Sequence, residues 1–356
     1  MSEDTVYGAF KIFHFPEALR AIADGSVAAP LHVRIKPINH CNHGCWYCAY
    51  RASPLQLGED MDLKDRLPEA KMFELVDDLV AMKVRAVTFS GGGEPLLYRA
   101  LPEVIERLGR GGVQVATLTN GINLKGRFAD ALAAHATWVR ISTDGWDDAS
   151  YARARGIPEG EFSRVIANMR AFADRGSACV LGVSFIVTRE NAGHIRDACA
   201  RFKDAGVRHV KLSAAVVAND GAENERYHEP ILATVAAEIA QAEALEDDRF
   251  RVVNHYHARA ERFDKDYTIC PFAHLLTVIG ADGNIYACQD KAYTQGGLLG
   301  SIRERSFREA WHAPETRARL AAIEPRRDCR HHCVAHAKNV AILEYLAYDR
   351  GHVAFV

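Results

Sequence analysis

Between residues 31 and 215, short runs rich in β-branched residues alternate with segments whose apolar residues recur at helical spacing. This alternation leaves few possible folds, because strands that alternate with helices form a parallel sheet joined by right-handed crossovers. The predicted strands are 31–38, 86–90, 113–119, 138–143, 179–188 and 207–213. The predicted fold class is therefore α/β, as a partial (β/α)6 barrel, in which functional groups lie on loops at the carboxyl ends of the strands.

Three glycines mark the ends of predicted helices. Gly112, Gly176 and Gly206 each stand just before a predicted strand. Glycine is favoured at such positions, because the residue that follows a helix often adopts the left-handed conformation. The glycines therefore support the same division of the chain into strand and helix units.

The character of the sequence changes after the last of these units. Residues 218–227 are polar and are predicted to be irregular, and Asp282-Gly283 is a strong signal for a β-hairpin turn. We predict a small C-terminal α+β domain around that hairpin. The predicted segments are an N-terminal extension (1–30), the partial barrel (31–217), a linker with a bridging helix (218–250) and the C-terminal domain (251–356).

Composition excludes several classes of protein. The 356 residues carry a net charge of -2, and Lys and Arg are scattered, so neither nucleic acid nor an anionic membrane is an expected partner. The N-terminus lacks the order of a signal peptide, and no apolar run approaches the length of a membrane span. We therefore expect a cytoplasmic protein. In a reducing compartment, its nine cysteines favour metal binding or catalysis over disulfides.

The first cysteine group directly follows the first predicted strand. Cys41, Cys45 and Cys48 have the spacing C-x3-C-x2-C. Thiolates suit iron–sulfur clusters or zinc. Three of them can hold three corners of a cubane cluster and leave the fourth iron open to chelate an amine and a carboxylate. A zinc site completed by His40 or His43 is the alternative that spacing alone leaves open.

The segment CNHGCWYC resembles the signature of the radical S-adenosylmethionine (SAM) superfamily. Supporting motifs follow the next three predicted strands, as SGGGEP (90–95), TNG (119–121) and STDG (142–145). For each of these motifs taken singly, a turn or helix cap is the alternative. The SAM-binding residues that the resemblance implies are Tyr47, Gly91, Gly92, Gly93, Glu94, Asn120, Ser142, Asp144 and Arg155.

The second cysteine group comprises Cys270, Cys288, Cys329 and Cys333, and Gly283 lies between the first two. This C-x12-G-x4-C arrangement resembles the twitch domain, a shorter relative of the SPASM domain. The resemblance implies one auxiliary 4Fe–4S cluster besides the SAM-binding 4Fe–4S cluster. A four-cysteine zinc site is the alternative, and one of the nearby histidines could replace a cysteine; these are His331, His332 and His336. Cys179 and Cys199 are predicted to be buried, inert thiols.

The resemblance also implies a reaction. A radical SAM oxidoreductase cleaves SAM to a 5′-deoxyadenosyl radical, which removes a hydrogen atom from the substrate. The auxiliary cluster would then take up an electron, and an electron donor such as flavodoxin or ferredoxin would supply the first cluster. A base must accept the proton, and the candidates are Asp290, Lys291, His274, His255 and His257.

The substrate is the least constrained feature. Peptide-modifying relatives often carry an added N-terminal recognition domain, and only about thirty residues precede the first predicted strand here. A single auxiliary cluster also resembles the aminocyclitol dehydrogenase branch. We therefore expect oxidation or epimerisation of a sugar- or cyclitol-type small molecule. The alternatives are a peptide-modifying enzyme and a structural zinc-binding protein.

Overall fold

The computed structural model describes residues 7–51, 55, 57–256, 263–349, 351–352 and 354–355. Its centre is one ten-stranded sheet with the order β10-β9-β8-β1-β2-β3-β4-β5-β6-β7. The strands from β8 through β1 to β7 are parallel, and β9 and β10 are antiparallel to their neighbours. The strands are β1 (His32–Ile35), β2 (Ala86–Phe89), β3 (Gln114–Thr119), β4 (Ala136–Thr143), β5 (Val180–Val187), β6 (His209–Ala214), β7 (Arg251–Asn254), β8 (Leu276–Ile279), β9 (Asn284–Tyr286) and β10 (Leu298–Ser301).

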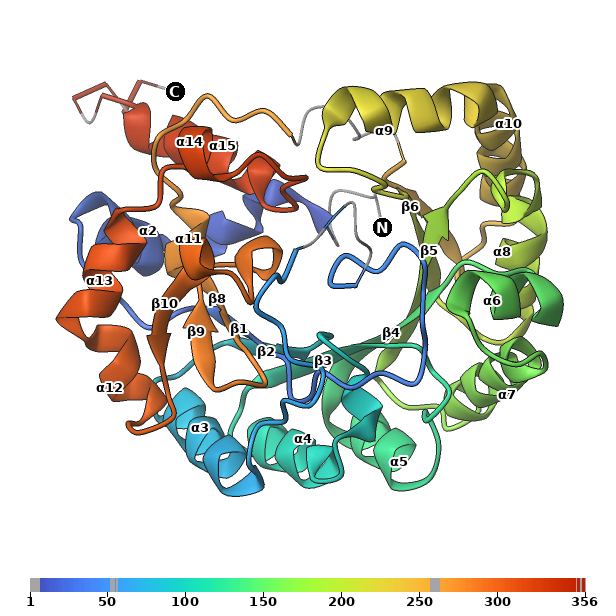
Figure 1. Cartoon of the computed structure of the whole chain (residues 1–356), viewed down its shortest axis with the longest axis horizontal. Helices are drawn as coiled ribbons and strands as arrows, with labels where there is room; N and C mark the ends of the chain where they lie inside the picture. Colours follow the sequence, from blue (N-terminus) through green and yellow to red (C-terminus); the bar gives the residue numbers. More distant parts are fainter. Residues whose placement is uncertain are drawn as a thin grey trace.

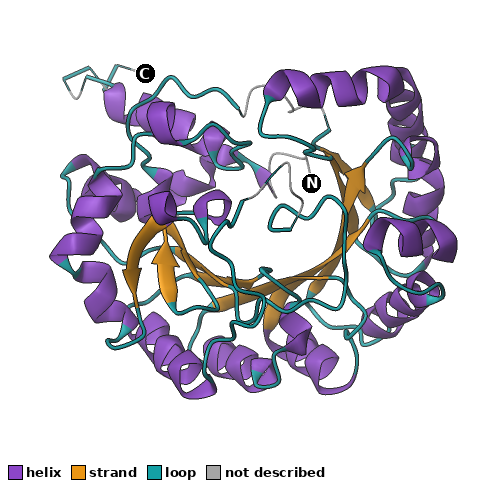
Figure 2. Ribbon diagram, in the orientation of Figure 1, coloured by secondary structure: helices purple, strands orange, loops and turns teal. Residues whose placement is uncertain are grey.

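The sheet curves into an arc with helices along its outer side (Figures 1 and 2). It does not close, because β7 and β10 each have one strand neighbour among the described residues. The helices of the repeating units are α3 (Glu69–Ala81), α4 (Leu101–Arg110), α5 (Gly126–His135), α6 (Asp148–Arg155), α7 (Glu161–Ala173), α8 (Ile195–Asp204) and α10 (Leu232–Glu243). The others are α2 (Pro16–Ala23), α9 (Gly221–His228), α11 (Phe272–Leu275), α12 (Phe307–His312), α13 (Pro314–Ala321), α14 (Pro325–Asp328) and α15 (His336–Ala347).

The main apolar core lies between the sheet and these outer helices. Alternate residues of each strand enter it, such as Val33 and Ile35 of β1, which are fully buried. The residues between them face the inside of the arc, and on β1 these are His32 and Arg34, which line a cavity there. Strand alternation thus places apolar side chains outward and polar side chains inward. The arc therefore presents polar groups on its concave side.

Each of the six predicted strands is present, and the predicted α/β partial barrel is confirmed. The glycines that follow α4, α7 and α8 have the left-handed φ values expected of them: +79° at Gly112, +63° at Gly176 and +82° at Gly206. Two strands were not predicted, namely β7, which has only four residues, and β10. The prediction of irregular structure over 218–227 is wrong for most of that segment. Asp220 accepts a hydrogen bond from the backbone of Glu223 and so starts helix α9.

The C-terminal hairpin extends the same sheet rather than forming a separate one. Strand β8 pairs in parallel with β1, His32 opposite Leu276, and turns into β9 at Gly283, whose φ is +76°. Strand β1 is therefore shared between the barrel and the C-terminal region. The predicted boundaries between the four segments stay a prediction.

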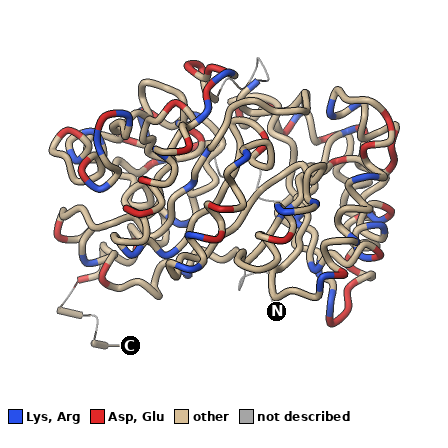
Figure 3. The backbone as a smooth tube through the Cα atoms, turned by 90° about the horizontal axis from the view of Figure 1, so that it is seen from below, with Lys and Arg blue, Asp and Glu red and all other residues tan. Residues whose placement is uncertain are grey.

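Two further expectations concern the outside of the molecule. Acidic and basic residues are interspersed along the chain (Figure 3), in line with the scattered charges of the sequence. Among the described residues, no helix is long and apolar enough to cross a membrane.

Candidate functional site

The first cysteine group lies in the loop that leaves the carboxyl end of β1. Cys41, Cys45 and Cys48 are partly exposed free thiols. The backbone amide of Gly44 donates to the carbonyl of Arg155 at 2.7 Å, and the amide of Cys48 donates to the carbonyl of Cys45 at 3.2 Å. The loop is thus tied to the end of α6 and folded on itself. The three cysteines therefore lie in one folded loop at the carboxyl edge of the sheet.

The glycine-rich motif packs directly against this loop. The amide of Gly93 donates to the carbonyl of Ile38 at 3.0 Å, and the amide of Glu94 donates to that of His40 at the same distance. A Cβ on Gly93 would overlap the carbonyl of His40, and one on Gly92 would overlap the side chain of Asn39. These glycines are therefore required for close packing. Contact of the motif with SAM, which the resemblance implies, stays a prediction.

Glu94 is buried and fully engaged by protein donors. One carboxylate oxygen accepts from the hydroxyl of Thr119 at 2.5 Å and from the amide of Leu96 at 3.0 Å, and the other accepts from the amide of Asn120 at 2.8 Å. Burial raises the pKa of Glu94, and these hydrogen bonds oppose the rise. The Asn120 side chain in turn donates to Asn42, inside the cysteine loop, at 2.9 Å. Glu94 and Asn120 therefore join two strand ends to the loop.

A buried ion pair lies at the end of β4. Arg155 Nε donates to Asp144 at 2.8 Å, and Arg155 Nη2 donates to Ser142 at 3.3 Å. The guanidinium also lies over the ring of Tyr47, 5.8 Å from its centroid. The structure thus brings Ser142, Asp144, Arg155 and Tyr47 together beside the cysteine loop.

These residues fit the cofactors that the sequence implies. Three thiols from one loop can hold three irons of a cubane cluster. The buried hydroxyl of Ser90 has no hydrogen-bond partner among the described residues, and a buried polar group without a partner indicates a polar ligand or water at that place. The donor set is therefore suited to SAM bound next to a 4Fe–4S cluster.

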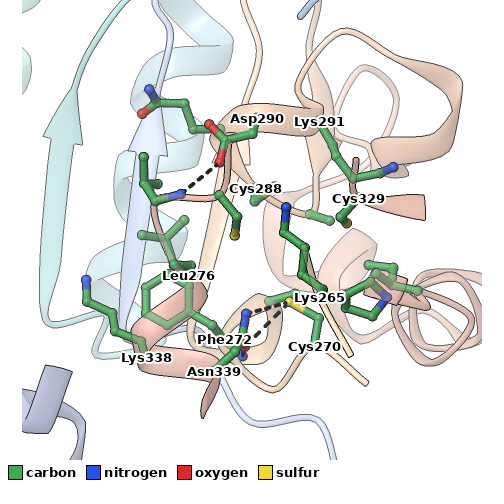
Figure 4. Close-up of a pocket in the computed structure, with 18 of the residues that line it drawn as sticks. Lys265, Cys270, Phe272, Leu276, Cys288, Asp290, Lys291, Cys329, Lys338 and Asn339 are labelled. Carbon is green, nitrogen blue, oxygen red and sulfur yellow. Dashed lines mark hydrogen bonds between the residues drawn. The ribbon is translucent and has the colours of Figure 1, made fainter. Parts of the chain in front are cut away.

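The second cysteine group lines a cavity of about 110 Å³ in the C-terminal region, and Figure 4 shows its walls. Cys270, Cys288, Cys329 and Cys333 all line it. Burial raises the pKa of Cys329 to about 11 and that of Cys333 to about 12. The metal-free protein thus holds both as thiols, and metal binding must release their protons. A cavity lined by four cysteines has the ligand number and type that a 4Fe–4S cluster requires.

Cys329 and Cys333 lie in the turn between α14 and α15. Helix α15 begins three residues after Cys333. Both cysteines line the same cavity as Cys270, whose sulfur accepts a hydrogen bond from the side-chain amide of Asn339 on α15 at 3.5 Å. Cys179 and Cys199 are buried in the barrel core, as predicted for inert thiols.

One buried lysine connects the two cysteine sites, and sequence analysis did not single it out. Lys36 follows β1, and its Nζ donates to the carbonyl of Gly91 and to the hydroxyl of Tyr50 at 2.7 Å. Tyr50 Oη donates to the carbonyl of Gln289, next to Cys288, at 2.9 Å. Burial and the nearby Arg34 lower the pKa of Lys36 to about 7. The sequence nevertheless contains a signal for Lys36, because this residue continues the alternation by which every second side chain of β1 faces the inside of the arc.

Comparisons with known proteins assign both cysteine regions. A model of the radical SAM superfamily matches residues 35–201, and a model of the SPASM iron–sulfur cluster-binding domain matches residues 270–334. The chain belongs to the radical SAM superfamily. Its SPASM region includes all four cysteines of the C-terminal cavity, and together the two domains imply SAM and 4Fe–4S clusters as cofactors.

Individual relatives of this radical SAM protein differ in activity. The PqqA peptide cyclase of Xanthomonas campestris is 24% identical over 304 residues, 83% of this chain and 77% of that protein. An S-adenosylmethionine-dependent nucleotide dehydratase of Lacinutrix mariniflava is 32% identical over 108 residues, only 30% of this chain and 22% of the dehydratase. Among solved structures, Streptococcus suis SuiB bound to the precursor peptide SuiA covers 90% of this chain and 76% of SuiB, with a TM-score of 0.62 and 15% identity.

The candidate bases of the radical SAM enzyme lie in different parts of the structure. Asp290 and Lys291 both line the auxiliary cavity (Figure 4). Burial raises the pKa of Asp290 to about 6, and Lys291 donates to the carbonyl of Asp328 at 2.9 Å. His274 lies on α11 and is not among the residues that line the cavity.

The other two candidates lie elsewhere. His255 follows β7, and its ring centroid is 5.3 Å from that of Tyr7. His257 lies outside the described residues. Of the four candidates that the structure describes, Asp290 and Lys291 line the auxiliary cavity, and their role as bases stays a prediction.

Proposed function

We propose that this radical SAM protein modifies a peptide by abstracting a hydrogen atom from it and passing an electron to the auxiliary cluster. The observation that carries this proposal is the placement of the two cysteine groups at opposite ends of the Lys36–Tyr50–Gln289 connection. When bound, SAM and the first cluster supply a 5′-deoxyadenosyl radical. The cofactor thus provides the hydrogen abstraction, and the protein positions the substrate and excludes water.

The chain's own residues have separable tasks in this proposal. Cys41, Cys45 and Cys48 hold the first cluster, and the Asp144–Arg155 pair fixes the neighbouring polar groups. SAM contacts the residues that the resemblance to the radical SAM superfamily implies. The four C-terminal cysteines hold the auxiliary cluster. Asp290, buried beside it with a pKa of about 6, is suited to accept the proton that leaves with the electron.

Two findings favour a peptide over the sugar or cyclitol expected from the sequence. The peptide cyclase of Xanthomonas campestris aligns with 83% of this chain, and the peptide-bound SuiB structure covers 90% of it. The unclosed sheet also suits a substrate that extends beyond one small-molecule site. The relatives reported above give no support to a carbohydrate substrate.

The test is an anaerobic assay of the iron-reconstituted enzyme with SAM, a strong reductant such as dithionite or reduced flavodoxin, and deuterated peptides encoded near its gene. We expect deuterium in 5′-deoxyadenosine and a mass change in one peptide. A Cys48→Ala variant should lose SAM cleavage, whereas Cys288→Ala should keep cleavage but form no product. Cys199→Ala, which removes a core thiol, is the control and should retain both.

Three results would contradict the proposal. Deuterium transfer from a labelled sugar or cyclitol, with none from any peptide, would restore the small-molecule substrate. Full product formation by Cys288→Ala would show that the auxiliary cluster takes no electron. Zinc in place of iron and sulfide after anaerobic reconstitution would establish the structural zinc protein instead.

A further inference from the structure

The charged residues in the wall of the auxiliary cavity are mostly basic. Asp290 is the one acidic residue among the described residues that line it. Four basic residues line the same cavity, namely Arg34, Lys265, Lys291 and Lys338 (Figure 4). This excess is opposite in sign to the charge that the four cysteines acquire when they bind metal as thiolates. The wall is therefore suited to hold an anionic cluster.

Lys265 is held at this wall by two backbone oxygens. Its side chain is buried, and its Nζ donates to the carbonyl of Phe263 at 2.7 Å and to the carbonyl of His331. His331 lies in the turn that carries Cys329 and Cys333. An ammonium group has three donors, so the two carbonyls leave one donor of Lys265 for another acceptor.

The cysteines are the groups best placed to balance the charge of this ammonium. Burial lowers the pKa of Lys265, and Cys333 and Cys329 oppose the fall more strongly than Asp290 and Asp264 do. A buried ammonium is costly unless an anion compensates it. Burial keeps both cysteines protonated in the metal-free protein, whereas metal-bound cysteines are thiolates. Cluster binding thus supplies compensation that the metal-free cavity lacks.

Lys291 reaches the same cysteines from another element. It ends the short helix η6 (Gln289–Lys291), and its Nζ donates to the carbonyl of Asp328, directly before Cys329, at 2.9 Å. Burial raises the pKa of Cys329 to about 11, and Lys291 and Lys265 both oppose that rise. Two ammonium groups from separate segments therefore act on one cluster ligand.

We propose that Lys265, assisted by Lys291, raises the reduction potential of the auxiliary cluster and so favours its uptake of the substrate's electron. A 4Fe–4S cluster held by four thiolates has a net negative charge, and reduction adds a further negative charge. A nearby ammonium therefore stabilises the reduced form more than the oxidised form, and net charge is among the properties that set cluster potentials. The role in turnover rests on the proposed function, whereas the potential is measured without substrate.

The electron comes from the substrate radical. A C–H bond of the peptide breaks when its hydrogen atom passes to the 5′-deoxyadenosyl radical. The peptide radical then loses one electron and one proton, which oxidises it and forms one new covalent bond in the product. The electron reduces the auxiliary cluster, and the proton passes to a base, for which Asp290 is suited. A one-electron carrier of the flavodoxin or ferredoxin class reoxidises the cluster.

The test is a redox titration of the auxiliary cluster followed by electron paramagnetic resonance. It uses the full-length chain with Cys41→Ala, Cys45→Ala and Cys48→Ala, so that the signal comes from the auxiliary cluster, and iron analysis confirms that this cluster assembles. We expect Lys265→Met to make reduction at least about tenfold less favourable, which is a fall of about 59 mV for a one-electron couple. Lys265→Arg retains the charge and should restore most of the potential.

Lys125→Met is the matched control. Lys125 is an exposed lysine directly before α5 and is not among the residues that line the cavity. Its removal should leave the potential unchanged. Lys291→Met is the second variant and should lower the potential in the same direction as Lys265→Met. It decides the question if Lys265→Met assembles no cluster.

Two results would overturn the proposal. The first is an unchanged potential in Lys265→Met, or in Lys291→Met where Lys265→Met assembles no cluster. The second is a fall in Lys265→Arg as large as that in Lys265→Met, because Lys265 would then only hold the turn in place. A lowered potential in Lys265→Met, together with full product formation by the holoenzyme that carries the same substitution, would confirm the effect of the charge but contradict the electron-accepting role in the proposed function.

Discussion

At the scale of single residues, ion pairs fall into two kinds. Arg155 and Asp144 are both buried and pair at 2.8 Å, whereas Arg107 and Asp77 pair on the outer helices with about half of each side chain exposed. A pair of the first kind stabilises the free protein only while both members are present, since removal of one leaves the other uncompensated. A pair of the second kind contributes little to stability, because water surrounds both charges.

We predict that Asp144→Asn lowers the free energy of unfolding of the metal-free protein by about 3 to 5 kcal/mol, because Arg155 then stays buried and unpaired. Asp77→Asn, which breaks the exposed pair with Arg107, should cost less than about 1 kcal/mol. Urea unfolding followed by circular dichroism measures both. Adding Arg155→Met to Asp144→Asn should recover much of the loss. Equal effects of the two single variants would show that burial does not distinguish the pairs.

At the scale of elements, the cysteine loop depends on the glycine motif after β2. Because Gly93 lies against the carbonyl of His40, we predict that Gly93→Ala displaces the loop and prevents the first cluster from assembling. Iron content after reconstitution should fall by about half, since the auxiliary 4Fe–4S site is untouched. Gly193→Ala is the control, because the nearest atom to its added methyl group is a methyl carbon of Thr234 at 4.0 Å. Unchanged iron in Gly93→Ala would contradict the packing argument.

Elements also show which parts of the fold a sequence can predict. Val33 and Ile35, like the buried residues of the other barrel strands, recur at every second position because each strand faces the same core. This alternation is visible in the sequence, and all six strands predicted from it are present. Strand β7 was missed, since RVVN is too short to show a period. The first cysteine group was found because its members are close in sequence, and the second because its spacing resembles the twitch domain. Lys36, Tyr50 and Gln289 were missed because their contacts join residues that are distant in the sequence.

At the scale of the whole molecule, the C-terminal region completes the sheet. Strand β8 covers the edge of β1 from His32 to Ile35, and the indole of Trp311 donates to the carbonyl of Ala28 at 2.8 Å. We predict that a chain ending at residue 256 exposes that edge and aggregates, whereas one ending at Tyr348 stays soluble. The soluble fraction after expression and the circular dichroism spectrum measure this. A soluble, fully helical short chain would show that the barrel folds without β8.

Strand β1 pairs with β2 on one side and with β8 on the other. It therefore holds the two redox centres that we propose at a fixed separation. Its end leads into the thiol loop, and its neighbour β8 leads through β9 to Cys288. The distance that the electron travels, from the substrate near the thiol loop to the auxiliary cluster at Cys288, is therefore fixed by hydrogen-bonded strands and does not depend on the angle of a hinge. Turnover in such a scaffold needs no rigid-body closure of one half on the other, and substrate entry depends on loops and on the open side of the arc.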